Sequence, residues 1–335
     1  MVSLWGSLRA VKDANDYVGI YAAAKLAGSG HLFDFGLIRR VEAPYQREPH
    51  PLPFIRLPIY ALVWKPLTWF PFQTGRLLWM LLNLAAMIAA ALLWPTRSLW
   101  AKAFVLCSYP FVYNLVLGQD TAFFLFFAVV ACRLLEKGRD RVAGLLISLC
   151  AIKFNLALLF PVVLIARRRW RAVGGAVAGL LTLAALSSFE GIDWPIREFQ
   201  SIQFVNVGQH AMPNFRGLAF WFPHSRVIEI ALGVALAVLV WWIARRTASL
   251  PNAMAAALAG GLLIGHHAYL YDAVVLMPLL LLALDTNELA WAIAAIEVSP
   301  FFYLLPAADY LSTIVWFISQ LLIIGFTIAL LFCLR

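Results

Sequence analysis

Polar side chains that can take part in chemistry interrupt a strongly apolar sequence at a few places. Asp16 precedes a short apolar run, Lys153 lies inside a long one, and Arg216 falls in the longest loop. A carboxylate can accept a proton as a general base, and cations can hold a departing anion. These residue types indicate a reaction in which a hydroxyl group loses its proton while an anionic group leaves. The full set is Asp16, Gln119, Asp120, Lys153, Asn214, Arg216, His266, His267 and Asp272.

The composition indicates what kind of protein must position these residues. Of 335 residues, 63% are apolar and 13% are charged, and the mean hydropathy is +0.83. Soluble globular domains carry about 25% charged residues, so the composition excludes a soluble enzyme, a disordered chain and a nucleic-acid-binding protein. At about 20 residues per membrane-spanning helix, the length leaves room for roughly ten crossings. We therefore expect an all-α fold, a polytopic transmembrane helical bundle in contact with membrane lipids.

The apolar runs divide this single domain, residues 1–335, into two parts. Residues 11–70 contain two short segments, 11–28 and 57–70, which we interpret as interfacial helices on the extracytoplasmic surface, separated by a polar, proline-rich loop. Residues 73–334 form the helical bundle. The expected spans are residues 73–94, 99–117, 121–135, 172–187, 227–244, 253–266, 269–284, 289–305 and 310–334.

Basic clusters determine the expected orientation of the bundle, because lysine and arginine collect on the cytoplasmic side of membrane proteins. The clusters lie at residues 137–141, 167–171 and 245–246. Residues 142–166 are apolar but have a basic cluster at each end, so they do not form one crossing. We interpret them as a re-entrant hairpin of two half-helices with Lys153 at its tip, near the middle of the membrane, where a lysine is usually functional. The alternative is that Lys153 lies in an ordinary span and extends toward the membrane surface.

This orientation gathers the polar residues on the extracytoplasmic side. One expected crossing separates Asp16 from the cytoplasmic side, and the loop 188–226, which contains His210 and Arg216, also lies outside. The distribution is more typical of an extracytoplasmic active site than of a conduction pathway. A transporter or flippase is the alternative, because broken helices and intramembrane charges occur there too. Such proteins commonly contain an internal repeat, and the sequence contains no second copy of the Lys153 hairpin.

The order of several motifs carries a resemblance to a known family. Asp16-Tyr17 is followed after three residues by Tyr21-Ala22-Ala23, and the later motifs keep a similar order over about residues 13–285. The chain resembles glycosyltransferase family 87. Two departures are that the first span usual in the family is expected to be absent, and that Phe154 stands where proline is common. The later motifs are Gly118-Gln119, residues 143–153, residues 167–171, residues 214–218, His266-His267 and Tyr271-Asp272.

The resemblance implies a fold of the GT-C class and an inverting hexosyltransferase. The resemblance implies that the donor is a hexose, mannose by the type of the family, on a polyprenyl phosphate. The acceptor would be a glycolipid or cell-envelope glycan outside the plasma (inner) membrane. Because the lipid phosphate is itself a leaving group, no nucleotide-binding domain is needed, and no dinucleotide-type glycine-rich loop is found. A metal site of His210, His266, His267 and Asp272 is conceivable, but the spacing is not that of a strong metal-binding motif. We expect no cofactor, no metal and no nucleic-acid partner.

The resemblance and the required chemistry assign roles to the charged residues. Asp16 is expected to be the catalytic base, although a carboxylate at a helix start can also act only as a cap. Arg216 and Lys153 are expected to bind the donor phosphate, with His266 and His267 as further hydrogen-bonding partners. Alternatively, Arg216 pairs with lipid headgroups.

A second group of residues is expected to contact the sugar or the acceptor. Aromatic rings beside Asp16 suit sugar stacking, and amides and carboxylates can bind sugar hydroxyl groups. Gln119 and Asp120 could instead cap the span that begins at residue 121, and Asp272 could pair with a neighbouring cation. The expected sugar or acceptor contacts are Tyr17, Tyr21, Gln119, Asp120, Asn214, Tyr271 and Asp272.

Overall fold

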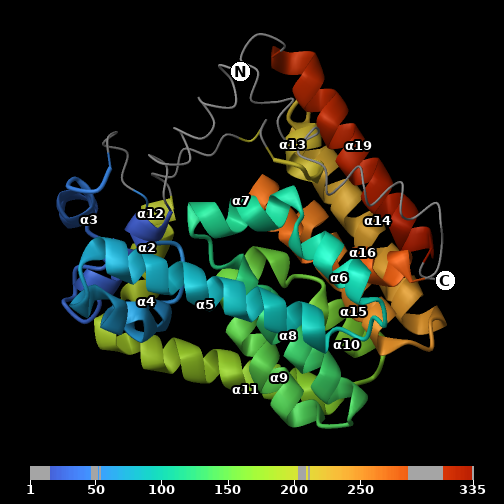
Figure 1. Cartoon of the computed structure of the whole chain (residues 1–335), viewed down its shortest axis with the longest axis horizontal. Helices are drawn as coiled ribbons and strands as arrows, with labels where there is room; N and C mark the ends of the chain where they lie inside the picture. The colour runs from blue at the N-terminus through green and yellow to red at the C-terminus, as the bar shows by residue number, and fades with distance from the viewer. Residues whose placement is uncertain are drawn as a thin grey trace.

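The regular elements of the protein are helices (Figure 1). The computed structural model describes residues 16–46, 52, 54–202, 209, 212–285 and 312–333, and these ranges contain no β-strand. This confirms the all-α fold expected from the composition. The described helices that are long and apolar enough to cross a membrane are α5 (Phe72–Leu93), α11 with its 3-10 extension (Trp170–Glu190) and α14 (Ser225–Arg246).

The N-terminal part is a group of short helices packed closely together. In the segment 11–28, predicted to be an amphipathic interfacial helix, residues 17–24 are all buried within the protein. The reason is that this helix packs against three neighbouring short helices and α5 at once, leaving no open face. Residues 11–15 lie outside the described residues. The short helices here are α2 (Tyr17–Leu26), α3 (Phe35–Glu42), α4 (Pro58–Trp64) and η1 (Lys65–Trp69).

Helix α3 lies where the sequence predicts only a loop. It begins at Asp34, whose carboxylate accepts the backbone N–H of Leu37 at 3.0 Å, as an N-cap does. The second expected interfacial segment, residues 57–70, is α4 followed by η1. Its side chains Leu62 and Trp69 are exposed, which is consistent with a short helix at a surface.

The first complete span, α5, agrees with the predicted residues 73–94, whereas the predicted span 99–117 is broken. Helices α6 (Leu99–Leu106) and α7 (Tyr109–Leu117) are bent by 49°. The hydroxyl of Ser108 accepts the N–H of Phe111 and starts α7, and Pro110 has no N–H with which to continue α6. Together the two helices are long and apolar enough to cross a membrane, so the predicted segment is present but bent at Ser108 and Pro110.

The segment between two basic clusters is a hairpin, as predicted. Asp140 Oδ1 and Arg169 Nη1 form an ion pair at 3.1 Å, so the start of the segment lies beside its end. Lys153 interrupts it with the non-helical dihedral angles φ −136° and ψ 66°. The hairpin consists of α9 (Asp140–Leu149), η2 (Cys150–Leu156) and α10 (Phe160–Ala166).

The depth of the hairpin follows from its contacts with α8 (Thr121–Glu136), a helix whose bounds match the predicted segment 121–135. Asp140 follows the C-terminus of α8, whereas Lys153 Nζ lies 3.7 Å from Asp120 Oδ1 at the N-terminus of α8. A helix of this length extends about 24 Å, so the tip and the open end of the hairpin are about that far apart. Along the way, Gly144 lies directly against the backbone of α11, where a side chain would collide.

Much of the described C-terminal part packs around helix α15, which is buried along most of its length. The predicted span 269–284 begins as a 3-10 helix and becomes α-helical only at Met277. The predicted span 289–305 and His210 lie outside the described residues. The elements of this part are α12 (Trp194–Ile202), α13 (Phe215–Ala219), α14 (Ser225–Arg246), α15 (Leu250–Ile264), η5 (Leu270–Leu276), α16 (Met277–Leu284) and α19 (Ser312–Cys333).

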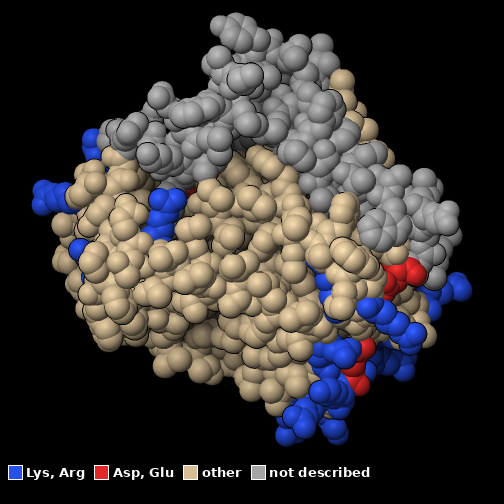
Figure 2. All heavy atoms as spheres, in the orientation of Figure 1, with Lys and Arg blue, Asp and Glu red and all other residues tan. Residues whose placement is uncertain are grey.

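Charged side chains are unevenly distributed over the face seen in Figure 2. Lysine and arginine gather at the lower right, where Figure 1 places the open end of the α9–α10 hairpin, and the middle of this face is almost free of charge. The tendency of lysine and arginine to collect on the cytoplasmic side predicts that this end faces the cytoplasm.

The hairpin predicts the accessibility of single cysteines in a variant without the native ones. Lys137→Cys, before α9, and Arg171→Cys, in the first turn of α11, are exposed and should react only from the cytoplasmic side. Asp193→Cys, beyond the other end of α11, should react only from the opposite side and is the matched control. Labelling intact cells and inverted vesicles with a membrane-impermeant maleimide measures this. Reaction of the first two cysteines from opposite sides would contradict the hairpin.

Candidate active site

A turn between α7 and α8 positions the centre of the site. Gly118 ends α7 in the left-handed conformation, with φ 73°, which glycine adopts without strain. The indole N–H of Trp79 donates to the Gly118 carbonyl at 2.8 Å and attaches the turn to α5. Gln119 and Asp120 follow directly and are both buried at the start of α8.

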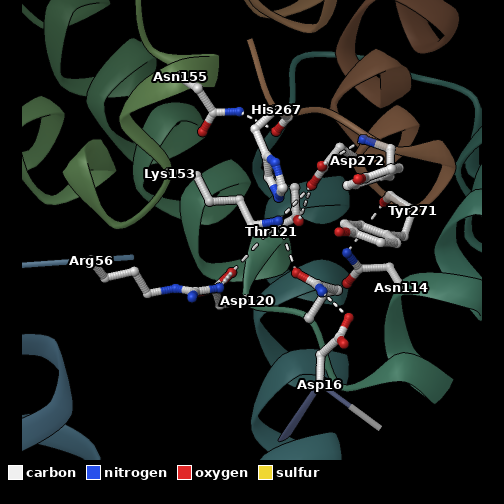
Figure 3. A network of polar contacts seen from close by, with 12 residues as sticks. Asp16, Arg56, Asn114, Asp120, Thr121, Lys153, Asn155, His267, Tyr271 and Asp272 are labelled. Carbon is white, nitrogen blue, oxygen red and sulfur yellow. Dashed lines mark hydrogen bonds and ion pairs between the residues drawn. The ribbon is translucent and has the colours of Figure 1, made fainter. Parts of the chain in front are cut away.

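Lys153 reaches this turn from the tip of the hairpin. Its Nζ donates to Asp272 Oδ1 at 2.6 Å and to Gln119 Oε1 at 2.9 Å, and it lies 3.7 Å from Asp120 Oδ1 (Figure 3). The ring of Tyr271 has its centroid 5.0 Å from the same nitrogen. Only 9% of the Lys153 side chain is exposed, so its charge depends on these partners. The alternative interpretation, in which Lys153 extends toward the membrane surface, therefore does not describe this structure.

Arg56 is a member of the site that the sequence did not predict. Its Nε and Nη2 both donate to the carboxylate of Asp120, Nη2 at 3.0 Å. Arg56 lies just before α4, in a segment close to several prolines where the sequence suggests little structure. The available signal was a lone arginine between the apolar residues Ile55 and Leu57, because an arginine beside an apolar helix usually needs a partner.

Asp16 approaches Gln119 from the side opposite Lys153. Its Oδ2 accepts a hydrogen bond from Gln119 Nε2, and its backbone N–H donates to the Leu117 carbonyl at 2.9 Å. Although Asp16 stands at the N-cap position of α2, its side chain makes no capping hydrogen bond there. The capping role that the sequence left open is therefore not observed, and the carboxylate is directed to the turn at Gln119.

These contacts form one network, drawn in Figure 3, which is buried at its centre and partly exposed at Asp16, Arg56 and Tyr271. We call it the buried network. Both oxygens of Asp272 are used, because Thr121 Oγ1 donates to Oδ1 at 2.8 Å and the N–H of Tyr269 donates to Oδ2 at 3.1 Å. With every group ionised, three carboxylates would face two cations. The members of the buried network are Asp16, Arg56, Gln119, Asp120, Thr121, Lys153, Tyr271 and Asp272.

Comparison with known proteins identifies the family. The model of glycosyltransferase family 87 matches residues 54–278, about two thirds of the chain. The chain belongs to glycosyltransferase family 87. No curated protein and no solved structure matches it. The family confirms the resemblance seen in the motifs, and a glycosyltransferase requires a sugar donor and an acceptor. Asp16, however, lies before the matched residues, so its assignment rests on the geometry and on the motif alone.

Arg216 of this family 87 glycosyltransferase lies outside the buried network. Its Nη1 contacts the ring of His266, and His266 Nδ1 lies 3.3 Å from Glu229 Oε1. We call Arg216, Glu229 and His266 the exposed cluster, since 71% of the His266 side chain is exposed. Partial burial lowers the pKa of Arg216. Arg216 and Lys153, both expected to bind the donor phosphate, therefore belong to two separate clusters.

His267 lies among buried groups although it directly follows His266. Figure 3 shows its ring directed toward Lys153. Burial lowers the pKa of His267 to about 4, with Asp272 opposing the effect and Lys153 adding to it. The ring is therefore neutral at pH 7, with one nitrogen as donor and the other as acceptor. Across the described residues, no three His, Cys, Asp or Glu side chains are placed to hold one metal ion, and His210 lies outside these residues.

The residues expected to contact the sugar or the acceptor are divided by the structure. Tyr17 and Tyr21 are buried and pack against other aromatic rings. The amide of Asn214 accepts the N–H of Gly217 at 2.9 Å and donates to the Gly265 carbonyl at 2.6 Å, and so starts α13. The others lie in the buried network: Gln119, Asp120, Tyr271 and Asp272.

Removing the charge of Asp120 should destabilise the protein strongly. In Asp120→Asn, Arg56 and Lys153 lose the anion that they share in a buried site, so we expect the free energy of unfolding to fall by about 3–5 kcal/mol. Asp140→Asn is the matched control, because Asp140 pairs with Arg169 at a partly exposed position and should cost less than about 1 kcal/mol. Denaturation of both variants in detergent micelles measures the difference. Equal losses of unfolding free energy in the two variants would show that the ion pairs of Asp120 stabilise the protein no more than the ion pair of Asp140.

Proposed function

We propose that this glycosyltransferase transfers a hexose, specifically mannose, from a polyprenyl phosphate to a glycolipid or cell-envelope glycan, with inversion at the sugar carbon. The reaction takes place at the extracytoplasmic face of the plasma membrane. The observation that carries the proposal is that the carboxylate of Asp16 ends a network that also holds the cations Arg56 and Lys153. A reaction that removes a proton and releases a phosphate needs groups of both kinds close together.

Asp16 acts as the general base in this proposal. Burial raises the pKa of Asp16, and the hydrogen bond from Gln119 and the charge of Lys153 oppose that rise. A higher pKa makes the ionised carboxylate a stronger proton acceptor. The acceptor hydroxyl gives its proton to Asp16 while its oxygen bonds to the sugar carbon. The bond between that carbon and the phosphate oxygen breaks, and polyprenyl phosphate leaves with the bonding electrons.

The donor phosphate lies between the two clusters in this proposal. Lys153 supplies a point charge from the buried network, and Arg216 supplies a planar guanidinium that can make a two-point contact. His266 and the neutral ring of His267 provide hydrogen bonds. Arg56 is the third cation of the proposed phosphate site. Its Nε and Nη2 donate to Asp120, and no described residue accepts a hydrogen bond from its Nη1, which can therefore donate to the phosphate.

The test is sugar transfer by the purified protein. Incubation with radiolabelled polyprenyl-phosphate mannose and a membrane lipid extract should give a labelled lipid or glycan. Asp16→Asn should lower turnover by about 10²–10⁴-fold, because an amide does not accept the proton. The change in stability should stay below about 1 kcal/mol, because Asp16 is partly exposed and the amide oxygen of asparagine can still accept the hydrogen bond from Gln119.

Asp34→Asn is the matched control for Asp16→Asn. Asp34 stands at the N-cap of the next helix, α3, and asparagine caps equally well, so transfer should be unchanged. Wild-type transfer should also decline as the pH falls through the raised pKa of Asp16, because only the ionised form accepts a proton. Near-full activity of Asp16→Asn would remove Asp16 from the mechanism. No transfer by the wild-type protein would contradict the proposed function itself.

Binding of polyprenyl phosphate, the product that carries only the leaving group, tests Arg216. Arg216→Ala should weaken binding by about 1.5–3 kcal/mol, the value of charge-assisted hydrogen bonds. Arg216→Lys should also weaken it, because an ammonium does not reproduce the two-point contact. Arg226→Ala removes the same charge from an exposed position nearby and should bind normally. Fluorescence titration of the four proteins decides this, and equal losses for Arg216→Ala and Arg226→Ala would indicate only a general charge effect.

A further inference from the structure

Gln119 connects two oppositely charged members of the buried network. Lys153 Nζ donates to Gln119 Oε1 at 2.9 Å, and Gln119 Nε2 donates to Asp16 Oδ2. Because Gln119 is only 5% exposed, water competes little for its amide. The oxygen and the nitrogen of the amide therefore each have a charged partner.

Only one orientation of the amide satisfies both partners. An ammonium group has three donors and no acceptor, and an ionised carboxylate only accepts. If the amide were rotated by 180°, its NH2 group would face the ammonium of Lys153 and its oxygen would face Asp16. Both contacts would be repulsive, so Lys153 determines which end of Gln119 is presented to Asp16.

We propose that Gln119 is a positioning residue for the transfer reaction, an amide bridge oriented by Lys153 that holds the Asp16 carboxylate in its reactive direction. Gln119 engages Oδ2 and leaves Oδ1, to which no described residue donates a hydrogen bond, free to accept the proton of the acceptor hydroxyl. This inference rests on the proposed role of Asp16 as the base. It differs from the role expected from the sequence, in which Gln119 contacts the sugar.

The surroundings of Asp16 determine what a change at Gln119 should do. The hydrogen bond from Gln119 favours the ionised carboxylate, so losing it should raise the pKa of Asp16. Other groups would remain in place in such a variant. The charged and titratable groups that act on Asp16 besides Gln119 are Lys153, Arg56, Asp120, Tyr113 and Tyr271.

Two variants of Gln119 test the proposal through the pH profile of transfer. Gln119→Met keeps the length of the side chain and removes both hydrogen bonds, so kcat should fall about 10- to 100-fold. The acidic limb of the profile should move to higher pH, because Asp16 then ionises less readily. Gln119→Glu still accepts from Lys153 but places a second carboxylate against Asp16, so the limb should move further. In both variants, KM for the donor should change less than kcat.

Gln200→Glu is the matched control, because Gln200 is exposed on α12 and the same charge is added away from the network. Its pH profile should equal that of the wild type. A sugar-contacting Gln119 would instead raise KM for the donor and leave the acidic limb in place, and that result would overturn the proposal. A purely structural Gln119 would lower the thermal stability of the variants without moving the limb, which would also overturn it.

The bridge can also be tested without turnover. Difference infrared spectroscopy follows the carbonyl stretch of the protonated Asp16 carboxyl group, which is assigned by its loss in Asp16→Asn. We expect this group to titrate at higher pH in Gln119→Met and Gln119→Glu than in the wild type, and an unchanged titration would overturn the bridge. Absence of transfer by the wild-type protein would refute the proposed function, while the titration would still decide whether the bridge exists.

Discussion

The carboxylate of Asp120 is the group on which the rest of the site depends, because both cations of the buried network share it. Arg56 binds it through two nitrogens, and Lys153 lies 3.7 Å away on the other side. The side chain is 1% exposed, so water does not separate the charges. Two cations held this close without an anion would repel each other strongly in a medium of low dielectric constant. Asp120 thereby joins the N-terminal segment, the start of α8 and the hairpin tip.

The same network explains why helices are broken where they meet. The turn between α7 and α8, the 3-10 helix η2 and the 3-10 helix η5 each contribute a member. Irregular backbone has free N–H and C=O groups, which are tolerated at membrane depth only where protein or a cavity surrounds them. Here the N–H of Tyr269 donates to the carboxylate of Asp272, and the carbonyl of Leu117 accepts the backbone N–H of Asp16. The helix breaks thus place polar groups of the network close together, and polar groups of the same segments satisfy backbone groups that the breaks leave free.

The parts of the structure that local patterns describe were predictable from the sequence. The Lys153 hairpin follows from an apolar segment with basic residues at both ends, and Gln119 and Asp120 were placed correctly at the start of a helix. Arg56 was missed because its partner, Asp120, lies 64 residues away and no local spacing links the two.

Other features depend on tertiary packing that no short pattern encodes. The burial of α2 results from four neighbours packed around an alanine-rich helix. The separation of Arg216 from Lys153 was also not predictable, because the expected topology places both residues toward the same side of the membrane but does not give the distance between them. The bend at Ser108 and Pro110 was visible in the sequence, but the apolar run around it favoured a continuous helix.

The close pairing of Lys153 with Asp272 has a consequence in a membrane that carries a voltage. A transmembrane potential does work of about 2.3 kcal/mol per 100 mV on each elementary charge that crosses it. Lys153 Nζ and Asp272 Oδ1 carry opposite charges only 2.6 Å apart, so the field acts on a pair with no net charge. The forces on the two groups nearly cancel, so the voltage does little net work on this pair when the tip of the hairpin moves.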